Sequence, residues 1–371
     1  MVGIEEQISE IEEEIKKTPY NKKTQHHIGK LKAKLARLRE EQRIRHIQTS
    51  SRGKATFAIK KSGHATVCLV GFPSVGKSTI LTKITNADSK IGEYAYTTLN
   101  VVPGTLEYQH AKIQILDLPG IIEGAAKGRG RGREVLSSVR SASLILLIAD
   151  VFNYNIRLLI EELHSAGIIL NRTRPDITVT KKARGGLTIN ATVRLTKLNL
   201  ELIQTIIREY GIINADVVIR EDVDENELID ALSDNVVYIP AVICLNKIDL
   251  LNHNQIVTKI QQEFPSYRIV PISAEKNVNL EELKKVIYEE LHLIRVYLKP
   301  QGAEADLKEP LVIKSDSTVK DICEFLHRDF VEKFRYAQIW GKNAKYPGQT
   351  VGLDYKLSDG DILTIIIRKG G

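Results

Sequence analysis

The chain has 371 residues, 43% of them hydrophobic, so it is too long for one ordinary domain and predicts two to four. No apolar run approaches the roughly 20 residues that span a bilayer, and the N-terminus is charged from Glu5 onward, which argues against a membrane span and a signal peptide. The net charge is +7 and the three cysteines lie in apolar runs without metal-ligand spacing, so we expect reduced thiols, a cytoplasmic location and no membrane partner.

Residues 1–60 predict a basic helical hairpin. Apolar residues recur at helical spacing in two stretches, and Pro19 and Asn21 mark the turn between them. The two stripes are Ile4, Ile8, Ile11 and Ile15, and then Ile28, Leu31, Leu35 and Leu38. Residues 1–14 contain 6 Glu and no basic residue, whereas residues 15–60 contain 14 Lys/Arg and 2 Asp/Glu. We therefore expect the acidic first helix to face the basic second helix.

The basic surplus of residues 15–60 has two interpretations. It is either a solvated face of the paired helices or a surface for phosphate groups, because clustered positive charge gives sequence-independent affinity for nucleic acid. The surplus exceeds what the acidic first helix can neutralise, which favours the phosphate surface.

A complete phosphate-binding motif, G-x-x-x-x-G-K-[ST], occupies residues 71–78. The apolar run 66–70 predicts a buried strand before it, and residues 79–84 predict a helix after it. In that setting the glycines let backbone N–H groups converge on phosphate oxygens, and the helix N-terminus adds partial positive charge. The alternative, a glycine turn that binds nothing, is disfavoured by the strand and the helix. The candidate nucleotide-binding residues are Gly71, Phe72, Pro73, Ser74, Val75, Gly76, Lys77, Ser78 and Thr79.

Polar groups near this motif predict a magnesium site. Lys77 would reach the β- and γ-phosphates, and the Ser78 hydroxyl would ligate Mg²⁺. Asp117 ends the apolar run 113–116, where its carboxylate is placed to hold Mg²⁺ through water. The backbone N–H of Gly120 can contact a γ-phosphate and so sense its loss.

Two later segments predict recognition of guanine. Asp249 follows the apolar run 241–245, and its carboxylate can accept hydrogen bonds from the N1–H and the exocyclic amine of guanine, a donor pair that adenine lacks. A buried carboxylate left unpaired is costly, so such a site discriminates strongly. The segment after the run 269–272 would support the base from the other side. The candidate base-site residues are Asn246, Lys247, Asp249, Ser273, Ala274 and Glu275.

These four motifs, in this order and each after a strand-like run, resemble the P-loop GTPases. Residues 96–100 and 117–126 resemble the two switch segments of the Obg-like class. With the basic N-terminus and the C-terminal pattern described below, the whole chain is similar to the developmentally regulated GTP-binding (DRG) proteins. The resemblance implies binding of GTP and GDP.

The resemblance also assigns roles to individual residues. It places Tyr96, Thr97 and Thr98 in the first switch, with Thr98 as the Mg²⁺ ligand and Thr97 as the nearby alternative. The implied catalytic residues are Lys77, Thr98 and Gly120, and the implied metal ligands are Ser78, Thr98 and Asp117.

Ile121 follows Gly120 at the position where Ras-like enzymes carry the Gln that orients the attacking water. An isoleucine cannot hydrogen-bond a water, so we expect slow hydrolysis by the isolated chain or another means of placing the water. The resemblance implies the hydrophobic-substituted GTPases, some of which use K⁺ in place of an arginine finger and often hold it with a P-loop Asn. Here that position is Ser74, a weaker ligand, so turnover with and without a K⁺ requirement both stay open.

An unusually long segment separates Asp117 from Asn246. Residues 143–150 predict a core strand and residues 155–166 a helix, after which roughly 70 residues intervene before Val236, about half a small domain. They predict two strands, at 176–180 and 187–190, and then a helix, so we expect an inserted αβ subdomain at about 168–238. Its first half is basic, which indicates either an RNA-facing patch or charge balance within the insert. These residues are Arg172, Arg174, Lys181, Lys182, Arg184, Arg194 and Lys197.

Glycines and basic residues alternate at 127–133, inside the second switch. The segment is either a solvated loop or a nucleotide-dependent contact with a phosphate-rich partner, and its place in a switch favours the contact.

The C-terminal segment predicts a compact β-rich domain. Residues 299–302 predict a linker, residues 311–313, 337–340 and 362–367 predict strands, and Ser317 or Thr318 can cap a helix with Ile322, Phe325 and Leu326 on its inner face. This order resembles the ubiquitin-like TGS module, which implies contact with RNA or the ribosome.

The sequence thus predicts an α/β protein: a P-loop GTPase core with an inserted αβ subdomain, an N-terminal helical hairpin and a C-terminal ubiquitin-like β-grasp (TGS) domain. The expected domains are residues 1–60, 61–298 and 299–371. The expected function is slow hydrolysis of GTP to GDP and phosphate by a switch associated with the ribosome or RNA, with a regulatory protein partner. The alternative is an RNA or ribosome scaffold in which GTP is mainly structural.

Overall fold

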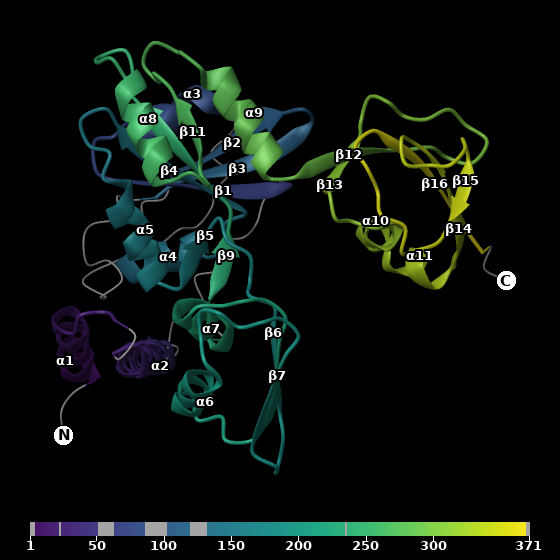
Figure 1. The fold of residues 1–371 in the computed structure, drawn as a ribbon. Coiled ribbons are helices and arrows are strands. Elements are labelled where there is room, and N and C mark those ends of the chain that lie inside the picture. The colour runs from purple at the N-terminus through teal and green to yellow at the C-terminus, as the bar shows by residue number, and fades with distance from the viewer. Residues whose placement is uncertain are drawn as a thin grey trace. The chain divides into compact units, whose positions relative to one another are not determined.

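The computed structural model describes residues 4–21, 24–50, 63–85, 102–118, 132–233 and 236–368. The chain divides into two compact units (Figure 1). One unit combines Met1–Phe57 with Gly167–Tyr238, and the other combines Ala58–Ala166 with Ile239–Gly371. The helical hairpin and the insert, which are far apart in the sequence, therefore belong to the same unit, whereas the domain boundaries given above stay predictions.

The larger unit contains a six-stranded sheet of order β11-β10-β4-β1-β3-β2. All neighbouring strands are parallel except β2 and β3, which are antiparallel. The central strands are continuous apolar runs because helices cover both faces of a parallel sheet. The strands are β1 (Ala65–Gly71), β2 (Val102–Tyr108), β3 (Ala111–Asp117), β4 (Leu144–Asp150), β10 (Ala241–Asn246) and β11 (Arg268–Pro271). The buried strands predicted from the sequence are confirmed.

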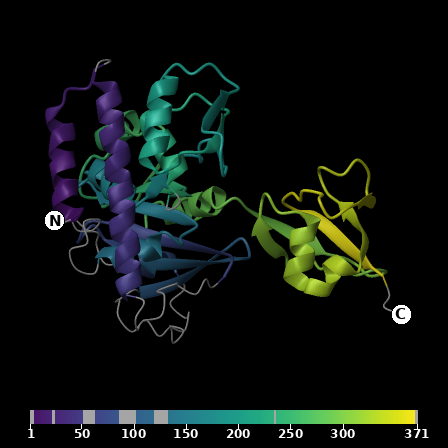
Figure 2. The ribbon, with the colours of Figure 1, turned by 90° about the horizontal axis from the view of Figure 1, so that it is seen from below.

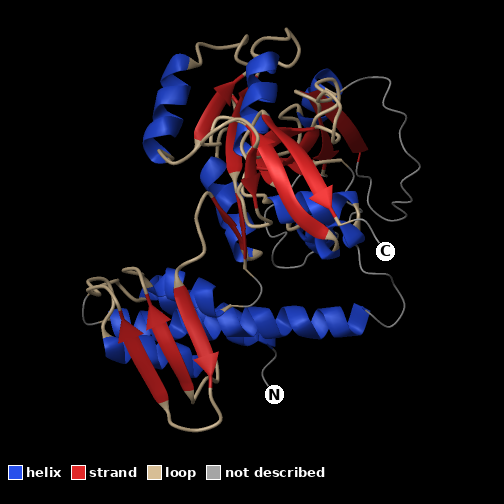
Figure 3. Cartoon of the chain, turned by 90° about the vertical axis from the view of Figure 1, so that its right-hand side faces the viewer, coloured by secondary structure: helices blue, strands red, loops and turns tan. Residues whose placement is uncertain are grey.

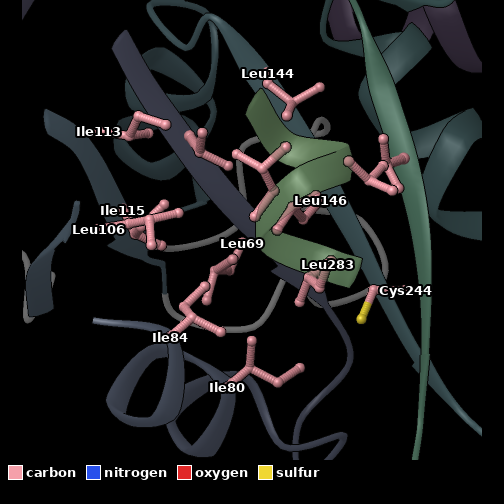
Figure 4. Packing of buried hydrophobic residues seen from close by; sticks show 14 of the residues in the cluster. Leu69, Ile80, Ile84, Leu106, Ile113, Ile115, Leu144, Leu146, Cys244 and Leu283 are labelled. Carbon is pink, nitrogen blue, oxygen red and sulfur yellow. The ribbon is translucent and has the colours of Figure 1, made fainter. Parts of the chain in front are cut away.

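The helices of this sheet are α3 (Lys77–Ile84), α4 (Gly132–Val139), α5 (Ile156–Ser165), α8 (Asn254–Glu263) and α9 (Leu280–Glu290). Ile80 of α3 and Leu283 of α9 pack with Leu69 and Leu146 of the sheet in one core cluster (Figure 4). Each such buried side chain contributes about 1.5–3 kcal/mol relative to an exposed one. The cluster fixes α3, and hence the loop before it, against the sheet.

The smaller unit is built on a three-stranded sheet of order β6-β8-β7. Strand β8 (Ala215–Ile219) is antiparallel to β6 (Ile177–Lys181) and parallel to β7 (Leu187–Ala191). Helices α6 (Leu200–Glu209) and α7 (Glu225–Leu232) pack against one face, and Figure 3 shows the strands with these helices behind them. A separate pair, β5 (Ile168–Leu170) and β9 (Val237–Ile239), lies where the chain enters and leaves the insert.

The predicted helical hairpin is confirmed and forms part of the insert's core. Helices α1 (Ile4–Lys17) and α2 (Gln25–Ser50) lie side by side in Figure 2. Ala33 of α2 is fully buried in the same cluster as Leu202 and Ile206 of α6. A Cβ at Gly29 would lie 2.9 Å from Leu202 Cδ1, so glycine allows the close approach of the two helices. The hairpin is therefore held by the insert as well as by its own apolar stripe.

Three basic side chains of α2 form ion pairs inside this unit. Within the hairpin, Arg39 pairs with Glu12 at 2.8 Å, as the facing acidic and basic helices predict. Toward the insert, Lys30 lies 3.7 Å from Glu209 and Lys32 lies 3.8 Å from Glu225. Part of the basic surplus thus stabilises the contact between hairpin and insert, which weakens its interpretation as a phosphate surface.

The C-terminal sheet has the order β13-β12-β16-β14-β15, with α10 (Val319–Leu326) and α11 (Arg328–Glu332) as its helices. Its strands are β12 (Leu293–Leu298), β13 (Leu311–Lys314), β14 (Phe334–Trp340), β15 (Gln349–Val351) and β16 (Asp361–Ile367). Strand β12 pairs with β13 and β16, so the sheet begins before the linker predicted at 299–302. Those residues instead form a turn inside the domain, where Lys299 N donates to Leu363 O at 2.9 Å.

One side chain predicted to be buried in this domain is exposed. Thr318 caps α10 in a capping box with Asp321, as expected. The inner face is formed by Val319, Ile322, Cys323 and Leu326, which recur at helical spacing. Phe325 falls off that face and is 68% exposed, so its assignment to the core was wrong.

All three cysteines are free and buried, as expected. Among the described helices, none has the length and apolar character needed to cross a membrane.

Candidate nucleotide-binding site

Four predicted segments converge at the carboxyl edge of the six-stranded sheet. The chain reverses its direction of strand addition at β1, whose two neighbours are β3 and β4. Ligands of open α/β sheets bind at such a point. The register places Asp117 beside Leu69 of β1, and Asp150 beside Asn246. The motif at 71–78 begins at the end of β1, so all these side chains meet at one edge.

The loop at 71–78 has a fixed backbone shape. Ser74 has φ 65° and Gly76 has φ 94°, both in the left-handed region. A Cβ at Gly71 would lie 2.3 Å from Ile148 O, and one at Gly76 would lie 2.4 Å from Asn246 Nδ2. Glycine is therefore required at 76 both by the backbone conformation and by the neighbouring amide.

Asn246, the last residue of β10, and Lys247, which follows it, hold the outward carbonyls of the loop. Lys247 Nζ donates to Ser74 O at 2.8 Å, and Asn246 Nδ2 donates to Val75 O at 2.9 Å. Because a trans peptide points its N–H opposite to its C=O, these bonds aim the next two N–H groups into the loop. Converging N–H groups of this kind form an anion-binding concavity.

The Lys77 ammonium lies inside the same loop. Its Nζ donates to Gly71 O at 3.0 Å and to Phe72 O at 2.8 Å. Burial lowers the pKa of Lys77, and the negative charge of Asp117 partly opposes this shift. A desolvated ammonium beside converging amides favours a polyanionic ligand, which would stabilise its charge.

Ser78 and Asp117, two of the metal ligands that the sequence predicts, are hydrogen-bonded to each other. Ser78 Oγ donates to Asp117 Oδ2 at 2.5 Å, and Asp117 is buried. A hydroxyl and a carboxylate are hard oxygen ligands that suit Mg²⁺. Among the described residues no group of three or more His, Cys, Asp or Glu could hold a metal. One hydroxyl and one carboxylate would fill only part of an octahedral shell, so phosphate oxygens and water would have to complete it.

Asn246 links the loop to the second base-site segment. Its Oδ1 accepts from Ala274 N at 3.1 Å while its Nδ2 holds Val75 O. Ser273 is buried, and its Oγ accepts from Lys276 N at 3.2 Å. Asp249 and Glu275 are exposed, so the burial expected for the Asp249 carboxylate is not found. The structure thus brings these segments together while leaving both carboxylates accessible.

Asp150 is a site residue that the sequence analysis missed. Its Oδ1 accepts from Phe152 N at 3.0 Å and from Asn153 N at 2.7 Å, which shapes the turn after β4. Its Oδ2 accepts from Lys247 Nζ at 2.5 Å. The available signal was an aspartate at the end of a buried strand, the same signal that identified Asp117.

Asp150→Asn is expected to weaken GDP and GTP binding by about tenfold, because a charge-assisted hydrogen bond contributes about 1.5–3 kcal/mol. The amide keeps an acceptor for the turn but removes the negative charge that holds Lys247. Titration with fluorescent nucleotides measures the effect. Lys247→Ala alone and the double variant complete a mutant cycle, and strictly additive losses would contradict this coupling.

Several predicted residues lie outside the described part of the chain. They are Tyr96, Thr97, Thr98, Gly120, Ile121 and the basic switch residues 127–131. Thr79 is described, is exposed, and lies in the first turn of α3.

Sequence profiles of known families match most of the chain. Residues 66–182 match a family described as a 50S ribosome-binding GTPase, and residues 184–293 match the C-terminal region of that domain. Residues 294–367 match the TGS domain, which agrees with β12 as its first strand.

Full-length relatives are also similar. An uncharacterized GTP-binding protein of Methanocaldococcus jannaschii is 54% identical over 372 residues, covering 100% of this chain and 94% of the relative. A developmentally-regulated GTP-binding protein 2 homolog of Dictyostelium discoideum is 44% identical, covering 98% of this chain and 100% of the relative. The human developmentally-regulated GTP-binding protein 2 is 41% identical with the same coverage. The chain belongs to the DRG family.

Membership of the DRG family confirms the resemblance and the fold class derived from the sequence. This DRG protein is a GTP-binding protein with a P-loop GTPase domain and a C-terminal TGS domain. The roles of its individual site residues stay predictions.

Proposed function

We propose that this DRG protein binds GTP with Mg²⁺ and hydrolyses it slowly to GDP and phosphate as a cytoplasmic switch for ribosome or RNA binding. The observation that carries the proposal is the P-loop, whose outward carbonyls are held by Asn246 and Lys247 beside the Ser78–Asp117 pair. The family description as a 50S ribosome-binding GTPase supports the ribosomal part.

The loop and its neighbours have distinct parts in the reaction. Lys77 and the loop N–H groups stabilise negative charge on the transferred phosphoryl group. Ser78 and Thr98 would ligate Mg²⁺, and Asp117 would hold it through water. The ion, when bound, would neutralise negative charge on the phosphate oxygens. Asp249 selects guanine, and Gly120 reports the γ-phosphate to the second switch.

Slow turnover follows from Ile121, which supplies no hydrogen bond to the attacking water. A regulatory protein or the ribosome would then supply the missing group, which makes partner binding part of the catalytic cycle. Nucleotide-dependent ordering of the switches would couple the site to RNA contacts.

Potassium is expected to speed turnover. Ser74 is exposed in the loop, and its left-handed backbone is one that Asn adopts readily, so Ser74→Asn should fit and supply a better ligand. We expect faster hydrolysis in K⁺ than in Na⁺, and a wider difference in Ser74→Asn, measured as phosphate release at equal ionic strength. Equal rates in both salts for both proteins would exclude a potassium site.

A scaffold in which GTP is mainly structural is the second candidate, and the isoleucine at position 121 favours it. Ribosome co-sedimentation with GDP and with a non-hydrolysable GTP analogue separates the two. A switch predicts a clear difference in bound fraction, and a scaffold predicts none. Deletion of residues 1–60 is unsuitable here, because Ala33 belongs to the insert's core and its loss would expose that core.

A further inference from the structure

One end of the insert's sheet carries a clamped basic loop. This loop tip consists of residues 181–186, which run from the end of β6 across β8 to the start of β7, and the adjoining turn 211–214. Lys182 N donates to Asn214 O at 3.0 Å, and Gly186 N donates to Asn214 Oδ1 at 2.8 Å. Figure 3 shows the loop running past the ends of the strands. The bonds to Asn214 give the tip a defined shape.

The tip carries positive charge that the fold does not neutralise. Lys182 pairs with Asp216 of β8. Lys181 and Arg184 are exposed and make no ion pair with any residue that the structure describes. Lys197, by contrast, lies 3.5 Å from Glu227. Charge balance within the insert therefore accounts for some of its basic residues, but it does not explain the positive charge of the tip.

The glycines of the tip allow its left-handed backbone conformation and are not required for close packing. Gly185 has φ 112° and Gly186 has φ 74°, and a Cβ at either would meet nothing within 4 Å. The backbone is thus open to an approaching ligand. Ile213, in the adjoining turn, is 71% exposed and adds one apolar contact at the same end.

The outer face of the sheet continues this surface with uncharged polar groups. Val179 and Ile189 pack against the helices on one face of the sheet. Because successive side chains of a strand point to opposite faces, the residues before and after them lie on the outer face. The register aligns Thr180, Asp216 and Thr188 in one row. A second row contains Thr178, Val218 and Asn190. The four hydroxyl- or amide-bearing residues on the two outer strands are exposed, and they are Thr178, Thr180, Thr188 and Asn190.

We propose that the loop tip and this outer face bind RNA, which places the RNA contact of the proposed function on the insert. Lys181 and Arg184 contact phosphates, and the threonine hydroxyls contact phosphate and ribose 2′-hydroxyl groups. Besides cations and hydroxyls, the named residues of the face include Val218 and the Asp216 carboxylate that Lys182 neutralises, and they form no contiguous apolar centre of the kind that protein interfaces bury. This composition favours RNA over a protein partner.

The test compares two full-length charge reversals of equal size. Lys181→Glu with Arg184→Glu alters the tip, and Lys16→Glu with Lys34→Glu alters exposed lysines of the hairpin helices in the same unit. The probe is a fluorescein-labelled 20-nucleotide RNA hairpin, titrated at several salt concentrations. We expect the tip variant to bind the RNA at least tenfold more weakly. The slope of log affinity against log salt concentration should also become shallower by about 1.5, because two phosphate contacts disappear. The control variant should stay within about threefold of the unaltered chain.

Equal losses in both variants would show that net charge alone binds the RNA, which overturns the proposal. Unchanged binding by the tip variant overturns it as well, and so does absence of RNA binding by the unaltered chain, which would also remove the RNA part of the proposed function. Fluorescent GDP binding and thermal unfolding of each variant show that the nucleotide site and the fold remain intact.

A second variant tests the outer face without a change in charge. Thr180→Val with Thr188→Val keeps side-chain shape and β-propensity but removes both hydroxyls. We expect it to lose severalfold affinity for the RNA hairpin and little for a DNA hairpin of the same sequence. Equal effects on RNA and DNA would contradict contacts to the 2′-hydroxyl.

Discussion

Asp249→Asn is expected to convert a guanine site into a xanthine site. In the proposed base site the Asp249 carboxylate would accept two hydrogen bonds from guanine, and the asparagine amide would present one donor where guanine also has a donor. Affinity for GTP should fall on the order of 100-fold or more, because a site built to hydrogen-bond its ligand strongly rejects the wrong partner. Affinity for xanthosine triphosphate should rise, since its 2-carbonyl can accept from the new amide. Competition titrations with GTP, ATP and xanthosine triphosphate measure the change.

The matched control for this experiment is Glu281→Gln, which removes a carboxylate that is 79% exposed in the first turn of α9. It should leave nucleotide preference unchanged. Unaltered GTP binding by Asp249→Asn would refute the assignment of Asp249 to the base.

Gly76→Ala is expected to abolish most nucleotide binding. The backbone at φ 94° disfavours alanine by about 1–2 kcal/mol. The added methyl group would also lie 2.4 Å from Asn246 Nδ2, so the amide must leave Val75 O. Both effects would disturb the P-loop N–H groups that are proposed to bind the phosphates, and affinity for GDP should fall on the order of 100-fold. Isothermal titration with Mg²⁺-GDP provides the measurement.

Gly211→Ala separates backbone strain from the clash. Gly211 has φ 73°, and a Cβ there would meet nothing within 4 Å. That variant should lose some stability and keep its nucleotide affinity. Similar affinity losses in both variants would indicate general destabilisation and would contradict a specific role for Gly76.

The larger sheet and its P-loop could be predicted because each signal is local. A strand buried on both faces is a continuous apolar run, and the glycine loop has a fixed spacing. Asp117 and Asn246 were found in the same way, from their positions after such runs. Asp150 follows an equal run but belongs to no short motif, and its role depends on Lys247, 97 residues away.

The features that could not be predicted depend on contacts distant in the sequence. Nothing local to Gly29 indicates that Leu202 will lie against it, so the hairpin and the insert were treated as separate parts. The lysines of α2 were likewise counted as surplus charge, because Glu209 and Glu225 are far along the chain. Strand β12 was also missed; one of its partners, β16, is distant in the sequence, although the other, β13, follows it closely.

The insert also sets an order of events during synthesis. Strand β4 ends at Asp150 and its neighbour β10 begins at Ala241. One edge of β4 therefore has no partner strand until the whole insert has been synthesised. Helix α2 ends at Ser50 and the insert unit resumes at Gly167, a gap of 117 positions, or about 6–23 s at 5–20 residues per second. The hairpin completes its core only when the insert emerges, and the Asn246 clamp on the P-loop forms later still. The residues of the smaller unit are therefore complete in the nascent chain before Asn246, which holds Val75 of the P-loop, is synthesised.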